Sequence, residues 1–343
     1  MSHSQIASCS FVSEPDNTNV VGSIHTSPSF ETPAPATPDR DRKLVVIQRN
    51  PRSGSGRGRR ELLHLIRELR LRGYRVRLFR NRLLLDQFLQ NPNRRNTLRC
   101  LVAAGGDGTV ADLTNRYSGI PVAILPLGTE NLIARYLKIS RCGNSVARMI
   151  DSFNVRPVDT FLANGHRILL MLSIGADAEV VRRLHAARSG NISHFSYLTP
   201  ILKSFCFYRP SMIVAKSGDA GPQFAGSHVI VTNIPAYGFG FPFAPDAQPD
   251  DGLLDVRVFI GTTRVQTLIH AVSVWFGRRR AEKSVVRFRC QQLTVFQGTV
   301  TSVTASSQTQ RTAAPVQCDG DPGPELPLQI TVDPASLLLI TPV

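Results

Sequence analysis

Residues 98–109, with the sequence Leu-Arg-Cys-Leu-Val-Ala-Ala-Gly-Gly-Asp-Gly-Thr, decide the fold class of this chain. The run from Leu98 to Ala103 is largely apolar and short, which is typical of a buried strand. Gly105–Thr109 follows it, and three glycines within four positions let the backbone approach a ligand closely. A helical stretch comes next, and its first N–H groups point into the same space and favour phosphate. The segment therefore predicts a strand, a phosphate-binding loop and a helix.

Asp107 lies inside this loop. A carboxylate repels bare phosphate at short range. Its position therefore makes sense either as a polar anchor for the loop or as a contact made through a cation.

The segments around this loop repeat the alternation of strand and helix. Lys43–Gln48 and Tyr74–Phe79 have the character of strands, and Val122–Leu125 adds another. An amphipathic helix is predicted over about 58–72 and a second over 84–89. This β-α-β-α-β order predicts a parallel sheet covered by helices.

The pattern changes after about residue 157, where short strands alternate with turns rich in Gly, Pro, Asn and Asp. This spacing predicts an antiparallel β-sandwich. Two helices are expected to interrupt it, at about 194–207 and 263–277. The strands are expected at 159–163, 167–174, 212–215, 227–233, 254–259, 285–289 and 293–295.

Four regions follow from these patterns. Residues 1–40 are rich in Ser, Thr and Pro without periodicity and are expected to be a disordered tail. Residues 43–157 form the α/β domain, and residues 158–325 form the β-sandwich domain. Residues 326–343 are expected to pack back on the first domain.

Positive charge is concentrated in one part of the chain, which carries a net charge of +15 overall. Between Arg40 and Arg99 there are 18 Lys or Arg residues and four acidic residues. Such a field attracts nucleic acid, anionic lipid or phosphorylated small molecules. The stretch holds few aromatic residues, so a stacking surface for single-stranded nucleic acid is not indicated. A solvated face without a partner is the alternative.

The composition argues against several classes of protein and site. The six cysteines form no CxxC pair, so a disulfide framework or a zinc site is not expected and a reducing cytosol is the default. No apolar run reaches the roughly 18 residues that span a bilayer. The histidines lack metal-ligand spacing, and no Ser-His-Asp set indicates a hydrolase.

Several motifs, in order along residues 43–343, resemble those of the diacylglycerol kinase and related bacterial lipid kinase family. Gly105–Thr109 resembles its nucleotide-binding signature, which NAD kinases share. Asn50–Gly54 resembles its Asn-Pro-x-Ser-Gly loop, and Pro126–Asn131 resembles its Pro-x-Gly-Thr-Gly-Asn loop. Asp250–Asp255 resembles an Asp-Gly-Leu-Leu-Asp segment of the bacterial branch, and Cys318–Asp321 is a weaker match.

The resemblance implies a fold and a nucleotide site. The fold would be an NAD kinase/diacylglycerol kinase-like α/β domain followed by an antiparallel β-sandwich domain. The loops at the ends of the parallel strands would bind ATP with Mg²⁺, where open α/β sheets bind ligands. The residues implied in nucleotide binding are Asn50, Pro51, Arg52, Ser53, Gly54, Gly105, Gly106, Asp107, Gly108, Thr109 and Thr129.

The resemblance also implies a structural magnesium ion in the second domain. Its ligands would be the Asp251 carboxylate and the main-chain carbonyls of Gln248 and Leu253. Oxygen ligands of this kind suit a hard cation. The alternative for Asp251 is a simple turn residue.

The implied catalytic residues are Asp107 and Asp321. The family places a glutamate at the position of Asp321, where it accepts the proton of the substrate hydroxyl, so the side chain here is one methylene shorter. Glu130 replaces the second glycine of the Gly-Thr-Gly-Asn loop. Asn131 is retained and is expected to face the acceptor hydroxyl.

The resulting hypothesis is an ATP-dependent lipid kinase that is cytoplasmic and peripherally associated with the membrane. Its acceptor would be a lipid hydroxyl of diacylglycerol or sphingoid type, and anionic lipids would attract the basic domain. Residues 193–210 and 265–280 are candidate interfacial segments, with core helices as the alternative. No nucleic-acid partner is expected, and a homodimer is left open.

Two other functions remain open. One is an NAD kinase-like soluble kinase, although that group lacks the loops at Asn50–Gly54, Pro126–Asn131 and Asp250–Asp255. The other is a catalytically impaired lipid- or nucleotide-binding homologue, in which Glu130 and Asp321 mark lost activity.

Overall fold

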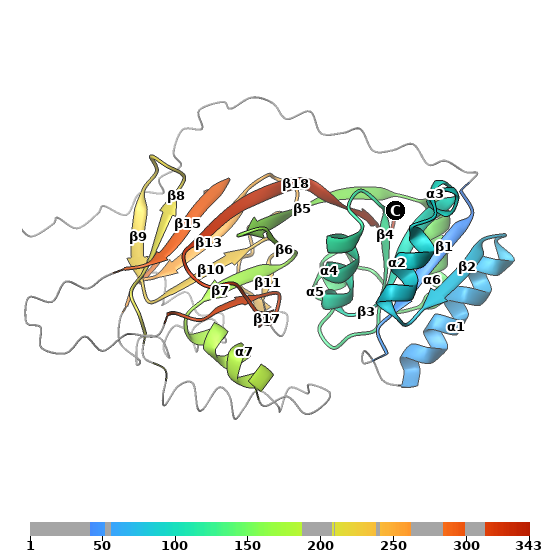
Figure 1. Ribbon diagram of the computed structural model, residues 1–343, viewed down its shortest axis with the longest axis horizontal. Helices are drawn as coiled ribbons and strands as arrows, with labels where there is room; N and C mark the ends of the chain where they lie inside the picture. Colours follow the sequence, from blue (N-terminus) through green and yellow to red (C-terminus); the bar gives the residue numbers. More distant parts are fainter. Residues whose placement is uncertain are drawn as a thin grey trace, which may run out of the picture. The chain divides into compact units, whose positions relative to one another are not determined.

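The computed structural model describes residues 42–51, 56–186, 208, 210–237, 241–261, 284–298 and 313–343 (Figure 1). The expected tail and the expected helices at 194–207 and 263–277 lie outside these residues, as does most of both candidate interfacial segments.

The first part of the chain forms the predicted parallel sheet. Its strands run in the order β2-β1-β3-β4, and each adjacent pair is parallel. The strands are β1 (Leu44–Arg49), β2 (Arg75–Phe79), β3 (Leu98–Gly105) and β4 (Val122–Pro126). Every residue of β3 and β4 is buried, which fits the continuous apolar runs in their sequences.

Helices cover this sheet, as the alternation of segments predicted. They are α1 (Gly56–Leu71), α2 (Arg82–Leu89), α3 (Pro92–Asn96), α4 (Asp107–Arg116), α5 (Leu132–Tyr136) and α6 (Gly143–Ser152). Helices α1 and α6 pack closely, because Gly143 has no side chain. A Cβ atom there would lie 2.1 Å from the Glu61 carbonyl oxygen.

One long strand, β18 (Leu328–Ile340), joins the parallel sheet to the sandwich. Leu339 pairs in parallel with Val122 of β4, while the rest of β18 pairs with β5 (Val155–Ala163) and with β15 (Gln292–Gln297) in antiparallel fashion. The last strand therefore pairs with the parallel sheet of the first domain. Figure 1 shows β18 and β5 running side by side.

The sandwich has two layers in the described residues. One layer continues the first sheet through β18, β15, β8 (Ile213–Ser217) and β9 (Gln223–Gly226), with β5 and β6 (His166–Ile168) attached. The other layer has the strand order β14-β13-β10-β7-β16-β17 and is antiparallel throughout. Its strands are β7 (Met171–Ile174), β10 (His228–Thr232), β13 (Leu254–Phe259), β14 (Val285–Cys290), β16 (Val316–Cys318) and β17 (Asp321–Pro322).

Apolar residues of both layers form one core. Phe161 of β5, Leu328 of β18, Val231 of β10 and Val256 of β13 belong to it and are buried. A separate hairpin of β11 (Ala236–Tyr237) and β12 (Phe241–Pro242) follows β10. The fold class predicted from the sequence, an α/β domain with a parallel sheet and an antiparallel sandwich, is confirmed.

Two local predictions were wrong. The single strand expected over 167–174 is split into β6 and β7, because the amides of Leu169 and Leu170 donate to the Asp319 carboxylate at 2.8 Å each instead of to a neighbouring strand. A helix that the sequence reading did not anticipate, α7 (Ala176–Ala186), follows β7. No helix within the described residues is long and apolar enough to cross a membrane.

Candidate functional site

The glycine loop after β3 has the predicted strand–loop–helix geometry. Gly105 ends β3, Gly106 is the N-cap of α4 without a side-chain cap, and Asp107 begins the helix. The first N–H groups of a helix have no intrahelical acceptor, and its dipole is positive at that end. The Thr109 hydroxyl is buried at the same corner and has no hydrogen-bond partner among the described residues. These donors at a helix start are suited to an anion.

The loop after β4 lies directly against the glycine loop. The amides of Leu127 and Gly128 donate to the Gly105 carbonyl at 2.8 Å and 3.2 Å. A Cβ atom on Gly128 would lie 2.5 Å from the Gly106 Cα atom. The two loops are therefore in backbone contact, and glycine at 128 is a steric requirement.

Asn131 stabilises the second loop from within. Its backbone is left-handed, with φ of 49°, and its side chain is buried. The Gly128 amide donates to Oδ1 at 2.9 Å, and Nδ2 donates to the Gly128 carbonyl at 2.7 Å. Both ends of its amide bind the loop backbone, and the expected contact of Asn131 with an acceptor hydroxyl stays a prediction.

Asp107 links the two loops through its carboxylate. It accepts hydrogen bonds from the amides of Leu132 at 2.9 Å and Ile133 at 3.2 Å, and so caps the start of α5. Burial raises the pKa of Asp107, and the nearby Glu130 carboxylate raises it further, while the amides oppose the shift. Of the two interpretations offered for Asp107, these contacts are those of a polar anchor, and its catalytic role stays a prediction.

The remaining residues implied in nucleotide binding are partly described. The Asn50 amide donates to the Ala104 carbonyl at 3.2 Å, so the loop after β1 lies beside the end of β3. Pro51, Thr129 and Gly108 are exposed. Glu130 lies 3.9 Å from Arg135. Arg52, Ser53 and Gly54 lie outside the described residues.

A tightly bound turn between β16 and β17 carries two more carboxylates. Asp319 accepts the amides of Leu169, Leu170 and Met171 at 2.8–3.0 Å, and its own amide donates to the Met171 carbonyl. Gln317 also holds the turn. Its side chain donates a hydrogen bond to Ser173 at 2.9 Å and accepts one from the Gly320 amide at 2.8 Å. This network holds the turn rigidly.

Electrostatics connects this turn to the glycine loop. Burial raises the pKa of Asp319 to about 6, with the three amides opposing the shift and the charge of Asp107 adding to it. Asp107 therefore lies within electrostatic range of Asp319, although the two residues are far apart in sequence.

Asp321 lies at the outer end of this turn, in β17. Its side chain is exposed and lies 3.0 Å from Nε2 of His185, near the end of α7. Figure 1 shows α7 beside β17. Asp321 is thus open to an acceptor, as a base requires, but one of its oxygens already has a partner.

The predicted metal ligands lie in one turn, which Asp159 holds in place. The buried Asp159 carboxylate accepts the amides of Gly252 at 2.8 Å and Ala335 at 2.7 Å. In this turn, Asp251 Oδ1 accepts the Leu253 amide at 3.0 Å, and Gln248 is exposed.

A guanidinium group lies beside the carboxylates of this turn. Arg289 lies 3.7 Å from Asp251 Oδ2, donates to Asp255 Oδ1 at 3.0 Å, and also donates to the main-chain oxygen of Asp246. A divalent ion ligated by Asp251 would lie next to this positive charge and be repelled by it. Arg289 is therefore one counter-ion of these carboxylates, and the assignment of Gln248, Asp251 and Leu253 as magnesium ligands stays a prediction.

Sequence reasoning missed four residues that organise this region: Asp159, His185, Arg289 and Asp319. Asp319 carried a signal, since it lies inside the motif that was matched. Asp159 and Arg289 carried none, because their partners are brought to them only by the pairing of β5 with β18 and of β13 with β14.

Two family models match almost all of the described chain. Residues 43–163 match the diacylglycerol kinase catalytic domain, and residues 171–341 match the YegS C-terminal NAD kinase beta sandwich-like domain. The chain therefore belongs to the diacylglycerol kinase catalytic domain family and carries the YegS C-terminal domain.

Curated relatives agree with this assignment. A protein named probable lipid kinase YegS-like from Alcanivorax borkumensis is 28% identical over 170 residues, which are 48% of this chain and 56% of that protein. One of the same name from Pseudomonas aeruginosa is 31% identical over 166 residues, which are 46% and 53%. The match thus spans about half the length of these relatives.

The fold also occurs in a solved structure. The crystal structure of a diacylglycerol kinase from Bacillus anthracis covers 88% of this chain, and 97% of that chain is covered, with a TM-score of 0.62 and 20% identity. At this identity, the likeness shows the shared fold.

Asp319 makes stability depend on pH. Its pKa in the folded chain, about 6, lies above the ordinary value of 3.8, so folding favours the protonated form. Its contribution to stability is present below the ordinary pKa and is lost as pH rises through 6. Between pH 4.5 and 7, we expect the free energy of unfolding of the wild type, minus that of Asp319→Asn, to fall by about 2 kcal/mol. Urea unfolding at both pH values measures this difference.

Asp219→Asn, at an exposed turn, is the control. Parallel pH curves for the wild type and Asp319→Asn would contradict the assignment.

Arg289 supplies positive charge to the turn that contains Asp246, Asp251 and Asp255, so we expect this turn to need no divalent cation. We expect the melting temperature of the full chain, without nucleotide, to be unchanged by EDTA and by millimolar Mg²⁺. Arg289→Met should destabilise the chain by roughly 1–3 kcal/mol, because it leaves half-buried carboxylates unpaired. Arg148→Met, at an exposed position on α6, is the matched control. A wild-type melting temperature that falls on chelation and recovers with Mg²⁺, but not with NaCl, would show that the predicted magnesium site exists.

Proposed function

We propose that this chain is an ATP-dependent lipid kinase that transfers the γ-phosphoryl group of ATP to a lipid hydroxyl, of diacylglycerol or sphingoid type. The observation that carries the proposal is the backbone contact between the glycine loop and the loop of Gly128. It supports a phosphate site because it gathers helix-start amides and the Thr109 hydroxyl without an intervening side chain. The family of the chain supports the choice of ATP and of a lipid acceptor.

The roles of the residues follow from this arrangement. Amides at Gly106–Gly108 would hold the phosphates, and Asp107 would keep the two loops together through α5. Mg²⁺ that arrives with ATP would neutralise phosphate charge. The turn of Asp319 would present Asp321 to the acceptor hydroxyl. Phosphoryl transfer depends largely on such positioning and charge neutralisation.

A steric change in the loop contact tests this function. Gly128→Ala places a methyl group against the Gly106 backbone, so the loops must separate. We expect kcat/KM for ATP to fall by about 100-fold, the usual result of displacing a reacting group by about 1 Å. Labelled ATP with diacylglycerol, sphingosine and phosphatidylglycerol in mixed micelles, and NAD in solution, measures the activity.

Gly58→Ala is the matched control, because its added methyl group makes only ordinary contact with Leu127. Its activity should stay within about twofold of the wild type. Phosphoryl transfer to NAD and to no lipid would contradict the lipid kinase and identify an NAD kinase. ATP binding without transfer to any acceptor would identify an impaired homologue.

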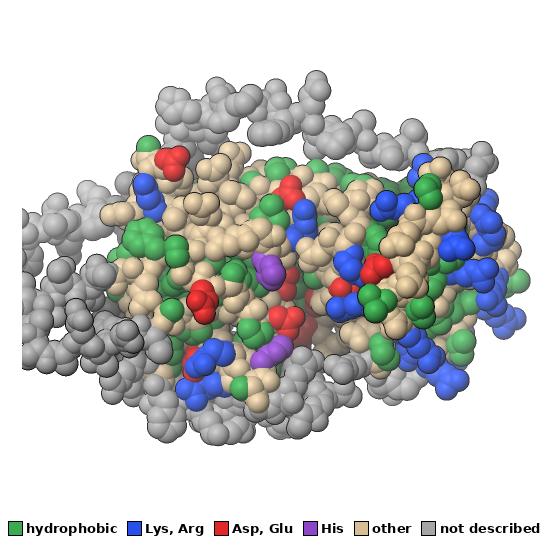
Figure 2. All heavy atoms as spheres, viewed as in Figure 1, with side chains coloured by type: hydrophobic (Ala, Val, Ile, Leu, Met, Phe, Trp, Pro, Cys, Tyr) green, Lys and Arg blue, Asp and Glu red, His purple; other side chains and the backbone are tan. Residues whose placement is uncertain are grey.

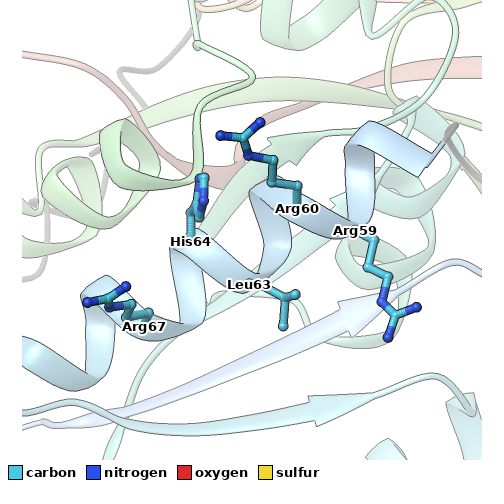
Figure 3. Close-up of a pocket in the computed structure, with 5 residues that line it drawn as sticks. All are labelled: Arg59, Arg60, Leu63, His64 and Arg67. Atoms are coloured by element: carbon cyan, nitrogen blue, oxygen red, sulfur yellow. The ribbon is translucent and has the colours of Figure 1, made fainter.

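We further propose that the outer face of α1 contacts anionic membrane lipid. The residues exposed along this face are basic or apolar: Arg59, Arg60, Leu63, Arg67, Arg70 and Leu71. Four of them and their neighbour His64 line one hollow, and Figure 3 shows these residues, which are Arg59, Arg60, Leu63, His64 and Arg67. Basic residues beside exposed leucines are typical of a helix at a membrane interface.

The two acidic residues of α1 have partners within the domain. Glu61 accepts the Gly143 amide at 2.9 Å, and Glu68 forms a salt bridge with Arg72 at 2.9 Å. Both carboxylates therefore serve the packing within the domain. Figure 2 shows Lys and Arg side chains gathered over the first domain, where α1 lies.

Vesicle binding tests this face. Replacing Arg60, Arg67 and Arg70 by Gln should weaken binding to phosphatidylglycerol-containing vesicles by about 100-fold, at about 1 kcal/mol for each charge. The control replaces Arg95, Lys138 and Arg148, which are exposed elsewhere on the same domain, by Gln with the same loss of charge. Equal weakening in both variants, measured by cosedimentation at fixed salt, would show a diffuse charge effect and refute a docking face.

A further inference from the structure

A hollow lies at the edge of the parallel sheet that is opposite to the glycine loop. Its volume is about 680 Å³, which is in the usual range for a small-ligand site. It is lined by Leu44 at the start of β1, Tyr74 just before β2 and Thr97 just before β3. Because the strands are parallel, the length of β3 separates this amino edge from Gly105, which is roughly 25 Å.

Four arginine side chains reach this hollow from three elements. Arg70 lies in the last turn of α1, Arg75 and Arg77 lie on β2, and Arg94 lies on α3. All four residues are exposed, and none of the described residues that line the hollow is acidic. Arg70, Arg75 and Arg77 form no side-chain hydrogen bond or ion pair in the described part of the chain. The hollow therefore gathers positive charge that no carboxylate in its lining balances.

The acidic residues nearest to these arginines have another partner. Arg72 forms salt bridges with Glu68 at 2.9 Å and with Asp151 at 2.8 Å. The Tyr74 hydroxyl donates to the other oxygen of Asp151 at 2.8 Å. Both carboxylates therefore serve to hold Arg72 and Tyr74 in place.

Aromatic rings of the hollow hold two cations. The Arg94 guanidinium lies over the Phe88 ring, 4.4 Å from its centre, and donates to the Phe88 carbonyl at 3.3 Å. The Lys43 ammonium lies 5.2 Å from the centre of the Tyr74 ring. A guanidinium that stacks on a ring loses less freedom when it then binds an anion. Arg94 is therefore oriented before a ligand arrives.

Arg75 and Arg77 lie on the same face of β2, because alternate side chains of a strand point the same way. Their backbones are roughly 7 Å apart, so the two positive charges repel each other. An anion with several oxygens relieves this repulsion by accepting hydrogen bonds from both guanidinium groups.

We propose that this hollow binds a compact ligand that carries two phosphate groups. Each guanidinium offers five N–H donors, and each phosphate offers three acceptor oxygens with more negative charge than a carboxylate. Free small molecules and lipid headgroups both carry such paired phosphates, so the experiments separate these two sources. The site is independent of the proposed kinase function, because it lies at the opposite edge of the sheet from the glycine loop.

Inorganic pyrophosphate is the probe, titrated calorimetrically into the full chain at low salt without Mg²⁺. Replacing Arg75 and Arg77 together by Gln should weaken its binding by about 100-fold, because two charged hydrogen-bonding groups are lost. Arg70 is left unchanged, since it also belongs to the outer face of α1. The control replaces Lys138 and Arg148, which are exposed elsewhere on the same domain, by Gln. Its affinity should stay within about threefold of the wild type, because solvent and salt screen distant charges.

Equal weakening in the two variants would show a diffuse charge effect and overturn the proposal. A wild type that binds no pyrophosphate would also overturn it. Citrate, a compact anion whose charges lie on carboxylates, should bind more weakly than pyrophosphate. Binding of citrate at equal strength would overturn the assignment to phosphate.

Pyrophosphate also suits the glycine loop, so the titration is repeated with Gly128→Ala. The binding that is lost on replacement of Arg75 and Arg77 should persist in Gly128→Ala. If Gly128→Ala instead abolishes all pyrophosphate binding, the glycine loop is the phosphate site and the hollow is not, which overturns this proposal and leaves the proposed function standing. A chain that phosphorylates no acceptor, but still binds pyrophosphate through Arg75 and Arg77, has the opposite outcome.

Vesicles identify the source of the paired phosphates. Cardiolipin carries two phosphates and phosphatidylglycerol carries one, and the two are compared at equal phosphate content. A lipid headgroup as ligand predicts that replacing Arg75 and Arg77 weakens cosedimentation with cardiolipin about tenfold more than with phosphatidylglycerol. A free small molecule as ligand predicts the same change with both lipids, while pyrophosphate binding is still lost. Either result supports the site, provided that pyrophosphate binding depends on these two arginines.

Discussion

The candidate site depends on one steric constraint, the backbone contact between Gly106 and Gly128. Two parallel strands, β3 and β4, end side by side, and their loops meet without side chains between them. Asp107 and Asn131 fix this contact, one by capping α5 and the other by closing the loop on itself. The polar side chains of both loops thus hold the backbone in place, and the backbone amides are left to face a ligand.

A second constraint, the continuity of β18, links this phosphate-binding edge to the rest of the molecule. By pairing with β4 and with β5 and β15, β18 makes the parallel sheet and one sandwich layer a single sheet. The opposite sandwich layer carries the turn of Asp319, whose charge interacts with Asp107. Strand pairing therefore brings residues more than 200 positions apart within electrostatic range.

The sequence predicted those features of the fold that local residue patterns determine. Continuous apolar strands, the helical period of α1 and the glycine loop identified the fold class and the family. The sequence did not predict contacts between side chains and partners on distant strands. The break between β6 and β7 depends on Asp319, about 150 residues away, and one counter-ion of Asp251 is Arg289 on another strand. Likewise, Asn131 matched a motif, but its role follows from a left-handed backbone that no residue pattern showed.

The central claim is that the amides of the glycine loop hold the triphosphate of a nucleotide. A crystal structure of the full chain with a non-hydrolysable ATP analogue and Mg²⁺ tests it most directly. We expect phosphate oxygens within hydrogen-bond distance of the Gly106–Gly108 amides and of the Thr109 hydroxyl. A triphosphate bound elsewhere, with this corner filled only by water, would contradict it.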